Sequence, residues 1–254
     1  AKIHETDVYL ETNDERSVPL RHVIYHSRWM YNIADSTKKE IGTNKLIFHE
    51  VEYNKALQMP ATVSMKESIY WSSFVKKLDE LKLLPALVYS FDNNKCSDIA
   101  KNCTKVRLLS APEYHSIVNL CDVLMKDLPQ SCQTDQNVID LFKLFTNGIG
   151  IFHYGFNQQV RKIVSDLFTE GYLKILFCVP SFDSFYFSPP VKTVCFSSLE
   201  KDDKNCISPL DYTQFSYKAG RRGIDSVGNS IICMDIKIED REKLVKLISH
   251  PEVL

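Results

Sequence analysis

The chain has 254 residues, of which 44% are hydrophobic and 25% are charged, and its formal net charge is −1 at pH 7. A chain of this length and composition can bury a sizeable core, which excludes intrinsic disorder and low-complexity sequence. No apolar run approaches the ~18 residues of a membrane span, and the polar first ten residues are not typical of a signal peptide. We therefore expect an intracellular protein, nuclear or cytoplasmic, with no membrane partner.

Helix-like and strand-like segments alternate along most of the chain. Residues 26–65 have weak periodicity, so we expect an irregular lead-in segment over residues 1–65 and one domain over residues 66–254. Helical spacing predicts helices at 66–84, 95–109, 157–170, from about 208–211 onward, and 239–250. Apolar β-rich runs predict strands at 86–91, 148–154, 174–179, 191–198 and 229–236. Residues 111–146 read as an inserted helical segment. This alternation predicts an α/β fold, a mostly parallel sheet with helices on both faces.

The cysteines and histidines, which often bind metals, lack the spacing of a metal site. None of the eight cysteines forms a C-x-x-C pair, and several lie in apolar runs, where cysteine behaves as a small buried hydrophobe. We expect free thiols and no metal site.

The most specific segment is DYTQFSYKAGRRGIDSVGNSII, residues 211–232. It places Gln214, Lys218, Arg221 and Arg222 on one short helix and loop, and Gly220 permits close backbone approach. Guanidinium groups beside such a turn suit the phosphate of a nucleotide. A solvated basic turn is the alternative.

This segment resembles motif VI of superfamily-two helicases, in the form found in the Ski/Mtr branch of exosome-associated DExH RNA helicases (Y-x-Q-M-x-G-R-A-G-R-R-G). Further matches follow the family's order: R-S-V-P-L-R-H at 16–22, P-A-L-V-Y-S-F at 85–91, G-I-G-I-F-H-Y-G at 148–155 and L-F-T-E-G at 167–171. The resemblance implies a RecA-like fold, specifically the second RecA-like domain of such an enzyme.

The resemblance also implies roles for individual residues. For ATP hydrolysis it points to Arg221 and Lys218, and for nucleotide binding to Gln214, Gly220, Arg221 and Arg222. For RNA binding it points to Ser90, Phe91, His153, Gly155 and Ser181. We expect Ser90, His153 and Arg221 to lie along one rim at the carboxyl edge of the sheet.

The sequence departs from the family at motif V, which is degenerate. Val179 stands where the family has an RNA-binding threonine, and Phe185 and Phe187 replace a glycine and an asparagine near the nucleotide. In motif VI, Lys218 replaces the first arginine, so the bidentate fork is lost. The aromatic cluster Phe182–Phe187 can stack on RNA bases, be buried, or bind a protein partner; we favour the last two.

The chain contains no G-x-x-x-x-G-K-(S/T) loop, the phosphate-binding element that the first RecA-like domain supplies in this family. We therefore expect ATP and Mg²⁺ to bind only together with a first RecA-like domain of the same parent chain, and this chain alone to hydrolyse no ATP. The two hypotheses are a helicase module that handles single-stranded or structured RNA, and a pseudo-helicase domain that acts as a protein or RNA scaffold.

Overall fold

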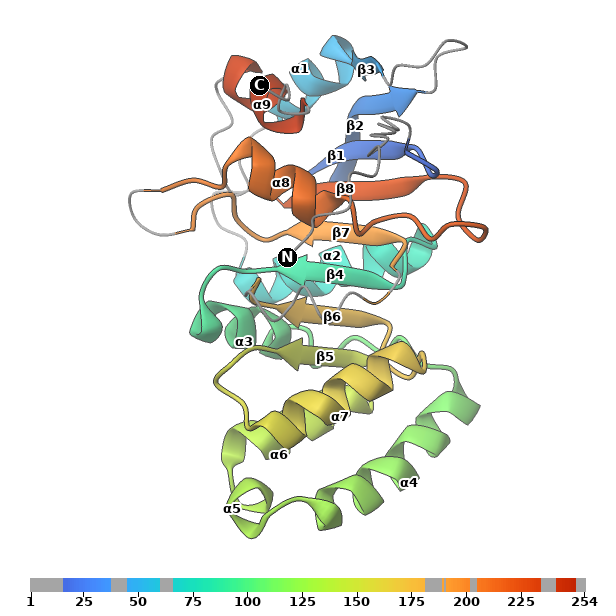
Figure 1. The fold of residues 1–254 in the computed structure, drawn as a ribbon, viewed down its shortest axis with the longest axis vertical. Coiled ribbons are helices and arrows are strands. Elements are labelled where there is room, and N and C mark those ends of the chain that lie inside the picture. The colour runs from blue at the N-terminus through green and yellow to red at the C-terminus, as the bar shows by residue number, and fades with distance from the viewer. Residues whose placement is uncertain are drawn as a thin grey trace, which may run out of the picture.

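The fold is built around one eight-stranded sheet, shown in Figure 1. The computed structural model describes residues 16–37, 45–59, 66–180, 189, 191–201, 205–233 and 241–249. The order of strands across the sheet is β3-β2-β1-β8-β7-β4-β6-β5. The strands are β1 (Leu20–His26), β2 (Trp29–Thr37), β3 (Lys45–Phe48), β4 (Ala86–Tyr89), β5 (Ile149–Phe152), β6 (Ile175–Cys178), β7 (Thr193–Phe196) and β8 (Gly228–Cys233).

Six of these strands run parallel to one another. β1, β8, β7, β4, β6 and β5 pair in parallel, while β2 and β3 add an antiparallel edge. The strands β4, β5, β6 and β7 are buried at every position, which explains why they stand out in the sequence as continuous apolar runs. The predicted α/β class and mostly parallel sheet are confirmed.

Helices cover both faces of this sheet. They are α1 (Glu50–Gln58), α2 (Glu67–Glu80), α3 (Asn93–Lys101), α4 (Ala111–Asp127), α5 (Gln130–Gln133), α6 (Gln136–Phe145), α7 (Gln158–Thr169), α8 (Pro209–Ser216) and α9 (Arg241–Ile248). In Figure 1, α7 and α8 lie in front of the sheet and α2 lies behind it. No helix in the described ranges is long and apolar enough to cross a membrane.

Local signals in the sequence account for several helix ends. The Asn157 side chain caps α7 by accepting a hydrogen bond from the Gln159 N–H at 2.9 Å, and Gly171 follows the helix with a φ of 82°. The helix predicted at 95–109 is shorter, because α3 ends at Lys101. Beyond it the chain turns and becomes extended, and the Leu108 N–H donates to the Asn147 carbonyl at 3.0 Å.

The expectation of irregular structure over residues 26–65 is wrong for β2, β3 and α1, which lie within that range. β2 buries Tyr31, Ile33 and Ala34, and its pairing with β1 shifts register between His22 and Val23. This bulge interrupts the alternation of buried and exposed side chains along β2, so the sequence shows little of the pattern that marks a strand. These strands join the same sheet as the rest of the chain, and a domain boundary at residue 66 stays a prediction.

Candidate functional site

Three residues lie side by side where the central strands β4, β6 and β5 end. The register pairs Tyr89 of β4 with Cys178 of β6, and Cys178 with Phe152 of β5. The next residue of each strand is therefore aligned as well: the Ser90 N–H donates to the Cys178 carbonyl at 3.0 Å, and the Val179 N–H donates to the Phe152 carbonyl at 3.2 Å. Ser90, Val179 and His153 form one row at the carboxyl edge.

Ser197 extends this row on the far side of β4 and was not singled out in the sequence. Its N–H donates to the Tyr89 carbonyl at 2.8 Å, and its buried hydroxyl has no hydrogen-bond partner within the described ranges. The signal was present, because the predicted strand at 191–198 ends in a pair of serines. We call Ser197, Ser90, Val179 and His153 the carboxyl-edge row.

His153 is held rigidly in this row. Only 7% of its surface is exposed, its ring stacks on Phe156 at 4.6 Å between centroids, and its Nε2 lies 2.8 Å from the Ser97 Oγ. Nδ1 accepts a hydrogen bond from the Gly155 N–H at 3.0 Å, so in the neutral ring the proton is on Nε2. Burial lowers the pKa of His153, which keeps the ring uncharged at neutral pH. His153 therefore shapes the turn into α7 rather than supplying positive charge.

Gly155 and Ser90 are part of the same tightly packed edge. A Cβ on Gly155 would lie 2.8 Å from the His153 ring, so no larger residue fits without moving that ring. Ser90 is 2% exposed, and its hydroxyl lies 3.4 Å from the Asp92 carbonyl at the start of α3. Phe91 is half-buried beside it. Ser181 lies outside the described residues.

The motif VI segment begins at the carboxyl edge but ends at the opposite edge. α8 starts after Ser208, whose hydroxyl and the Asp211 carboxylate form a capping box. The helix then crosses the face of the sheet, and Ala219 forms a parallel bridge with Val191, which precedes β7. The Gly220 N–H donates to the Val191 carbonyl at 2.8 Å.

The expectation that Ser90, His153 and Arg221 share one rim is therefore wrong. Strands that run in parallel require each connection to return to the amino edge, and α8 makes that return before β8 begins. Arg221 consequently lies at the amino edge, in the loop between α8 and β8, whereas Ser90 and His153 lie at the carboxyl edge.

Two glycines let this loop approach the sheet. Gly220 has a φ of 92°, and a Cβ there would lie 2.7 Å from the Val18 Cγ1. A Cβ on Gly228 would lie 2.5 Å from the Ala219 carbonyl oxygen, which is backbone and cannot rotate away. Both positions thus require glycine to hold the loop against the amino edge.

Arg221 is fixed by a carboxylate within its own loop. Its Nε and Nη2 donate to the two Asp225 oxygens at 2.7 and 2.9 Å, and its backbone N–H also donates to Asp225 at 2.9 Å. The Arg221 guanidinium lowers the pKa of Asp225, and the carboxylate raises the pKa of Arg221. The pair leaves the Nη1 group of Arg221 for another acceptor, while the neighbouring Arg222 side chain is exposed.

Lys218 and Gln214 lie on different parts of the α8 segment. The Lys218 ammonium lies 5.9 Å from the centre of the buried Tyr89 ring, and burial lowers the pKa of Lys218. Gln214 is exposed on α8. Among the predicted nucleotide-binding residues, Gly220, Arg221 and Arg222 are adjacent in one loop, whereas Gln214 lies on α8; the predicted catalytic Lys218 has its ammonium near the Tyr89 ring.

Similarity to known proteins covers most of this chain. DExH-box ATP-dependent RNA helicase DExH11 of Arabidopsis thaliana is 30% identical over 88% of the chain and 16% of its own length. ATP-dependent RNA helicase mtr4 of Schizosaccharomyces pombe is 26% identical over 94% of the chain, and human Superkiller complex protein 2 is 27% identical over 97%. The chain is a homologue of Ski2/Mtr4-type DExH-box RNA helicases. No family model matches it.

This helicase homologue spans only part of its relatives. It covers 23% of the Schizosaccharomyces pombe protein and 21% of the human protein. Val179 carries no hydroxyl, so within the carboxyl-edge row the hydroxyl groups come from Ser90 and Ser197 alone. Phe182–Phe187 lie outside the described residues.

Proposed function

We propose that this chain is the second RecA-like domain of an ATP-dependent RNA helicase of the Ski2/Mtr4 type. The observation that carries the proposal is the carboxyl-edge row, because ligands of open α/β sheets bind outside the carboxyl ends of the strands. Two helices also begin there: α3 follows Ser90, and α7 follows His153. Their N-terminal N–H groups give this edge a positive partial charge that favours RNA phosphates.

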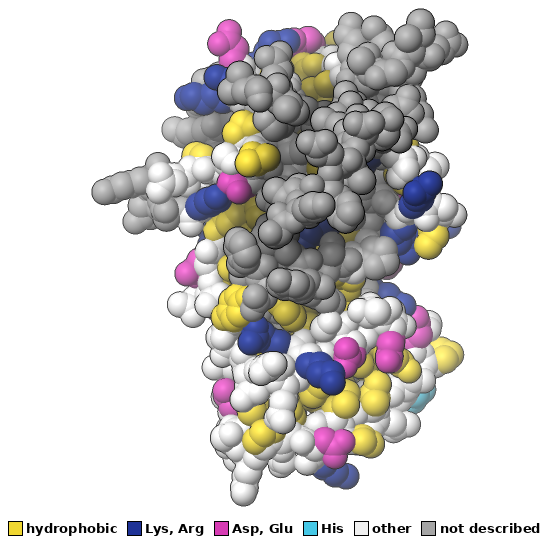
Figure 2. Space-filling view, viewed as in Figure 1, with side chains coloured by type: hydrophobic (Ala, Val, Ile, Leu, Met, Phe, Trp, Pro, Cys, Tyr) yellow, Lys and Arg dark blue, Asp and Glu magenta, His cyan; other side chains and the backbone are white. Residues whose placement is uncertain are grey.

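In this proposal RNA phosphates contact backbone amides and hydroxyls rather than a dense basic surface. Figure 2 shows basic side chains interspersed with acidic ones over the described part of the face that it presents. The net charge of −1 agrees with this distribution. The Ser90 and Ser197 hydroxyls are buried in the unbound chain and would donate to a phosphate once the edge opens to RNA, and His153 and Gly155 would hold the turn that presents the α7 amides. Affinity should therefore be modest and should fall with salt.

The nucleotide would bind at the other edge, together with a first RecA-like domain that supplies the phosphate-binding loop and the Mg²⁺ ligands. Arg221 is the residue we assign to the developing charge on the transferred phosphate, because its Nη1 group is outside the Asp225 pair and Asp225 fixes the guanidinium in place. Arg222 and Gln214 would support nucleotide binding, whereas the Lys218 ammonium lies over Tyr89, the last residue of β4, and so nearer to the carboxyl edge. This chain alone would hydrolyse no ATP.

A second candidate function is a pseudo-helicase scaffold that binds protein partners, with or without RNA. Two observations favour it: Val179 removes a hydroxyl from the carboxyl-edge row, and Lys218 replaces an arginine and lies over Tyr89. Under this proposal the Phe182–Phe187 segment would be the protein-binding surface. Either function is compatible with an intracellular location, nuclear or cytoplasmic, which we propose with it.

The decisive experiment measures RNA-stimulated ATP hydrolysis by this chain joined to a first RecA-like domain with an intact phosphate-binding loop. The helicase proposal expects stimulation by single-stranded RNA and a loss of at least about 100-fold in turnover for Arg221→Ala. Arg107→Ala, a substitution between α3 and α4, is the matched control and should leave turnover unchanged. If the joined protein hydrolyses no ATP even when single-stranded RNA is present, the result favours the scaffold.

RNA binding by the chain itself gives a second test. Fluorescence anisotropy with a labelled single-stranded RNA should detect binding that weakens as salt rises from 50 to 200 mM. Ser90→Ala combined with Ser197→Ala should weaken it further, while Ser165→Ala, on α7 away from the row, should not. Binding that is insensitive to salt and to both serines would contradict an RNA-binding edge.

A further inference from the structure

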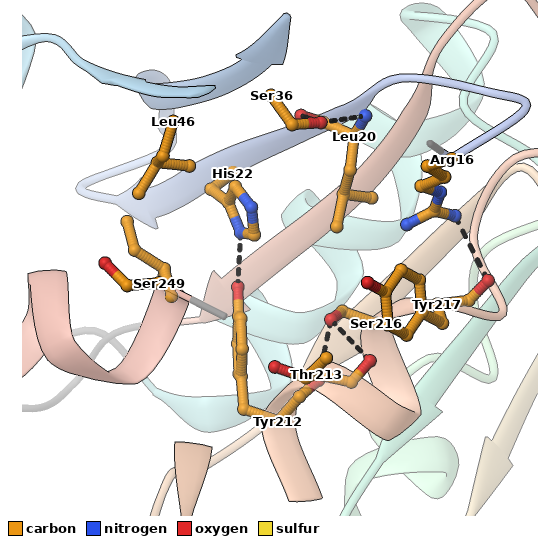
Figure 3. Close-up of a pocket in the computed structure, with 11 residues that line it drawn as sticks. Arg16, Leu20, His22, Ser36, Leu46, Tyr212, Thr213, Ser216, Tyr217 and Ser249 are labelled. Carbon is orange, nitrogen blue, oxygen red and sulfur yellow. Dashed lines mark hydrogen bonds between the residues drawn. The ribbon is translucent and has the colours of Figure 1, made fainter. Parts of the chain in front are cut away.

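A cavity of about 250 Å³ lies on the sheet face between α8, α9 and the first strands, away from the carboxyl-edge row. Figure 3 shows Arg16, His22 and Tyr217 among the residues around it. β1 and β3 contribute Leu20 and Leu46, so part of the wall is apolar. The cavity is formed by residues widely separated in the sequence, and the motif VI match assigns it no role.

Arg16 has hydrogen-bonding capacity that the described part of the protein does not use. Its Nη2 donates to the carbonyl oxygens of Tyr217 and Ala219, and its guanidinium carbon lies 5.1 Å from the centre of the Tyr217 ring. Nη1 is buried and has no hydrogen-bond partner among the residues that the structure describes. Burial lowers the pKa of Arg16 to about 10, so the group stays charged at neutral pH. A buried, charged donor without an acceptor is unfavourable, which makes it a good binding group for an anion.

The other polar groups of the described wall are hydroxyls and the His22 ring. Thr213 and Ser249 line the cavity from α8 and from the residue after α9. Tyr212 is engaged elsewhere, because its hydroxyl lies 2.8 Å from both the His22 Nδ1 and the Ser230 Oγ. The described wall therefore offers one guanidinium, hydroxyl groups and part of the His22 ring beside an apolar surface that includes Ile248.

The charge of the wall limits the class of ligand. Among the described residues that line the cavity, Arg16 is the one with a permanent charge. A monocarboxylate carries one negative charge and would neutralise it. A phosphate monoester carries −1.5 to −2 at neutral pH and would leave uncompensated charge in a half-buried site. The apolar residues would contact a short hydrocarbon body, which an inorganic anion lacks.

We propose that this cavity is a binding site for a small monocarboxylic acid, with the carboxylate on Arg16 and the hydrocarbon part against Leu20, Leu46 and Ile248. Tyr217, which is 46% exposed, stands at the rim of the cavity beside Arg16. The site lies away from the carboxyl-edge row, to which the proposed function assigns RNA, and on its other side Arg16 reaches the Ala219 carbonyl next to the loop of Arg221.

An amide NMR titration of the 254-residue chain with butyrate tests the proposal. The expected result is saturable binding with a Kd on the order of 1 mM, with shifts at Thr213, Tyr217 and Ser249. The neutral analogue 1-butanol should bind at least about tenfold more weakly, and n-butyl phosphate should bind no more tightly than butyrate. Arg16→Gln should weaken butyrate binding at least about tenfold.

Two more variants keep the outcome interpretable. Thr213→Leu fills the cavity without touching the Arg16 hydrogen bonds, and it should also abolish binding; Arg107→Gln, at the far end of the molecule, should not change it. The proposal is overturned if butyrate does not bind, if 1-butanol binds equally well, if the phosphate ester binds more tightly, or if butyrate binding survives Thr213→Leu.

Discussion

Replacing Asp225 by asparagine removes the carboxylate that fixes Arg221. Three hydrogen bonds from Arg221 reach this carboxylate, at 2.7, 2.9 and 2.9 Å, and the Asp225 side chain is 5% exposed against 23% for Arg221. Charged hydrogen bonds each contribute about 1.5–3 kcal/mol, and asparagine keeps one acceptor oxygen while turning an N–H₂ toward the guanidinium. We expect Asp225→Asn to lower the free energy of unfolding by about 2–3 kcal/mol, less than the 3–5 kcal/mol of a fully buried pair.

Urea unfolding of the chain measures this loss, and a double-mutant cycle with Arg221→Gln isolates the pair. The coupling free energy should exceed about 1 kcal/mol. The exposed pair of Asp140 and Lys143 provides the control, because Asp140→Asn should leave the unfolding free energy unchanged. An Asp225→Asn variant as stable as the wild type would refute the structural role of the pair.

The same pair has a defined pH dependence. Arg221 lowers the pKa of Asp225 below its ordinary value of 3.8, so the stabilisation is complete above that value and is lost as pH falls through the lower pKa of the folded protein. The stability difference between wild type and Asp225→Asn should therefore be constant from pH 7 to 5 and should narrow only below about pH 4. A difference that narrows between pH 7 and 5 would point to another group.

Three further predictions concern stability. Gly228→Ala should lower the free energy of unfolding by about 2 kcal/mol or more, because the new Cβ would lie 2.5 Å from a backbone oxygen. Gly171→Ala should lower it by about 1 kcal/mol, because only the positive φ of this position disfavours alanine. Equal losses in urea unfolding would contradict the close approach at Gly228. Tyr212→Phe should cost about 1–3 kcal/mol by the same measurement, since it removes a buried hydroxyl that bridges a histidine and Ser230, and a neutral result would show that the bridge contributes nothing. Burial lowers the pKa of His153 below 6.5, so the unfolded chain binds more protons than the folded chain. The free energy of unfolding should therefore fall as pH drops below about 6.5, by at most about 1.4 kcal/mol per pH unit. This slope should vanish in His153→Gln, and a slope that persists there would come from another titratable group.

The central strands could be predicted because burial on both faces leaves a direct trace in the sequence. β4 and β6 are apolar at every position, and the glycine after α7 marks its end. β2 and β3 left no such trace. They lie at one edge of the sheet, where half of the side chains meet solvent and a bulge breaks the alternation, so their place depends on pairing with β1 rather than on local pattern.

The candidate site was only partly predictable for the same reason. Ser90 and His153 come together because both follow parallel strands, and parallel strands end at one edge whatever lies between them. Arg221 was placed at the wrong edge, because its position depends on how far α8 travels before β8 begins. The Arg16 cavity could not be predicted at all, since its walls come from the segments around β1, β2, β3, α8 and α9 and meet only after folding.

The path of α8 has a mechanical consequence. Its eight residues make a rod about 12 Å long, anchored by the capping box at Ser208 and by the Ala219–Val191 bridge at its other end. A helix of this length moves as a unit, because bending it would break backbone hydrogen bonds. A displacement of either anchor would therefore be transmitted to the opposite rim, so the regions we assign to RNA and to nucleotide are joined by a single stiff element.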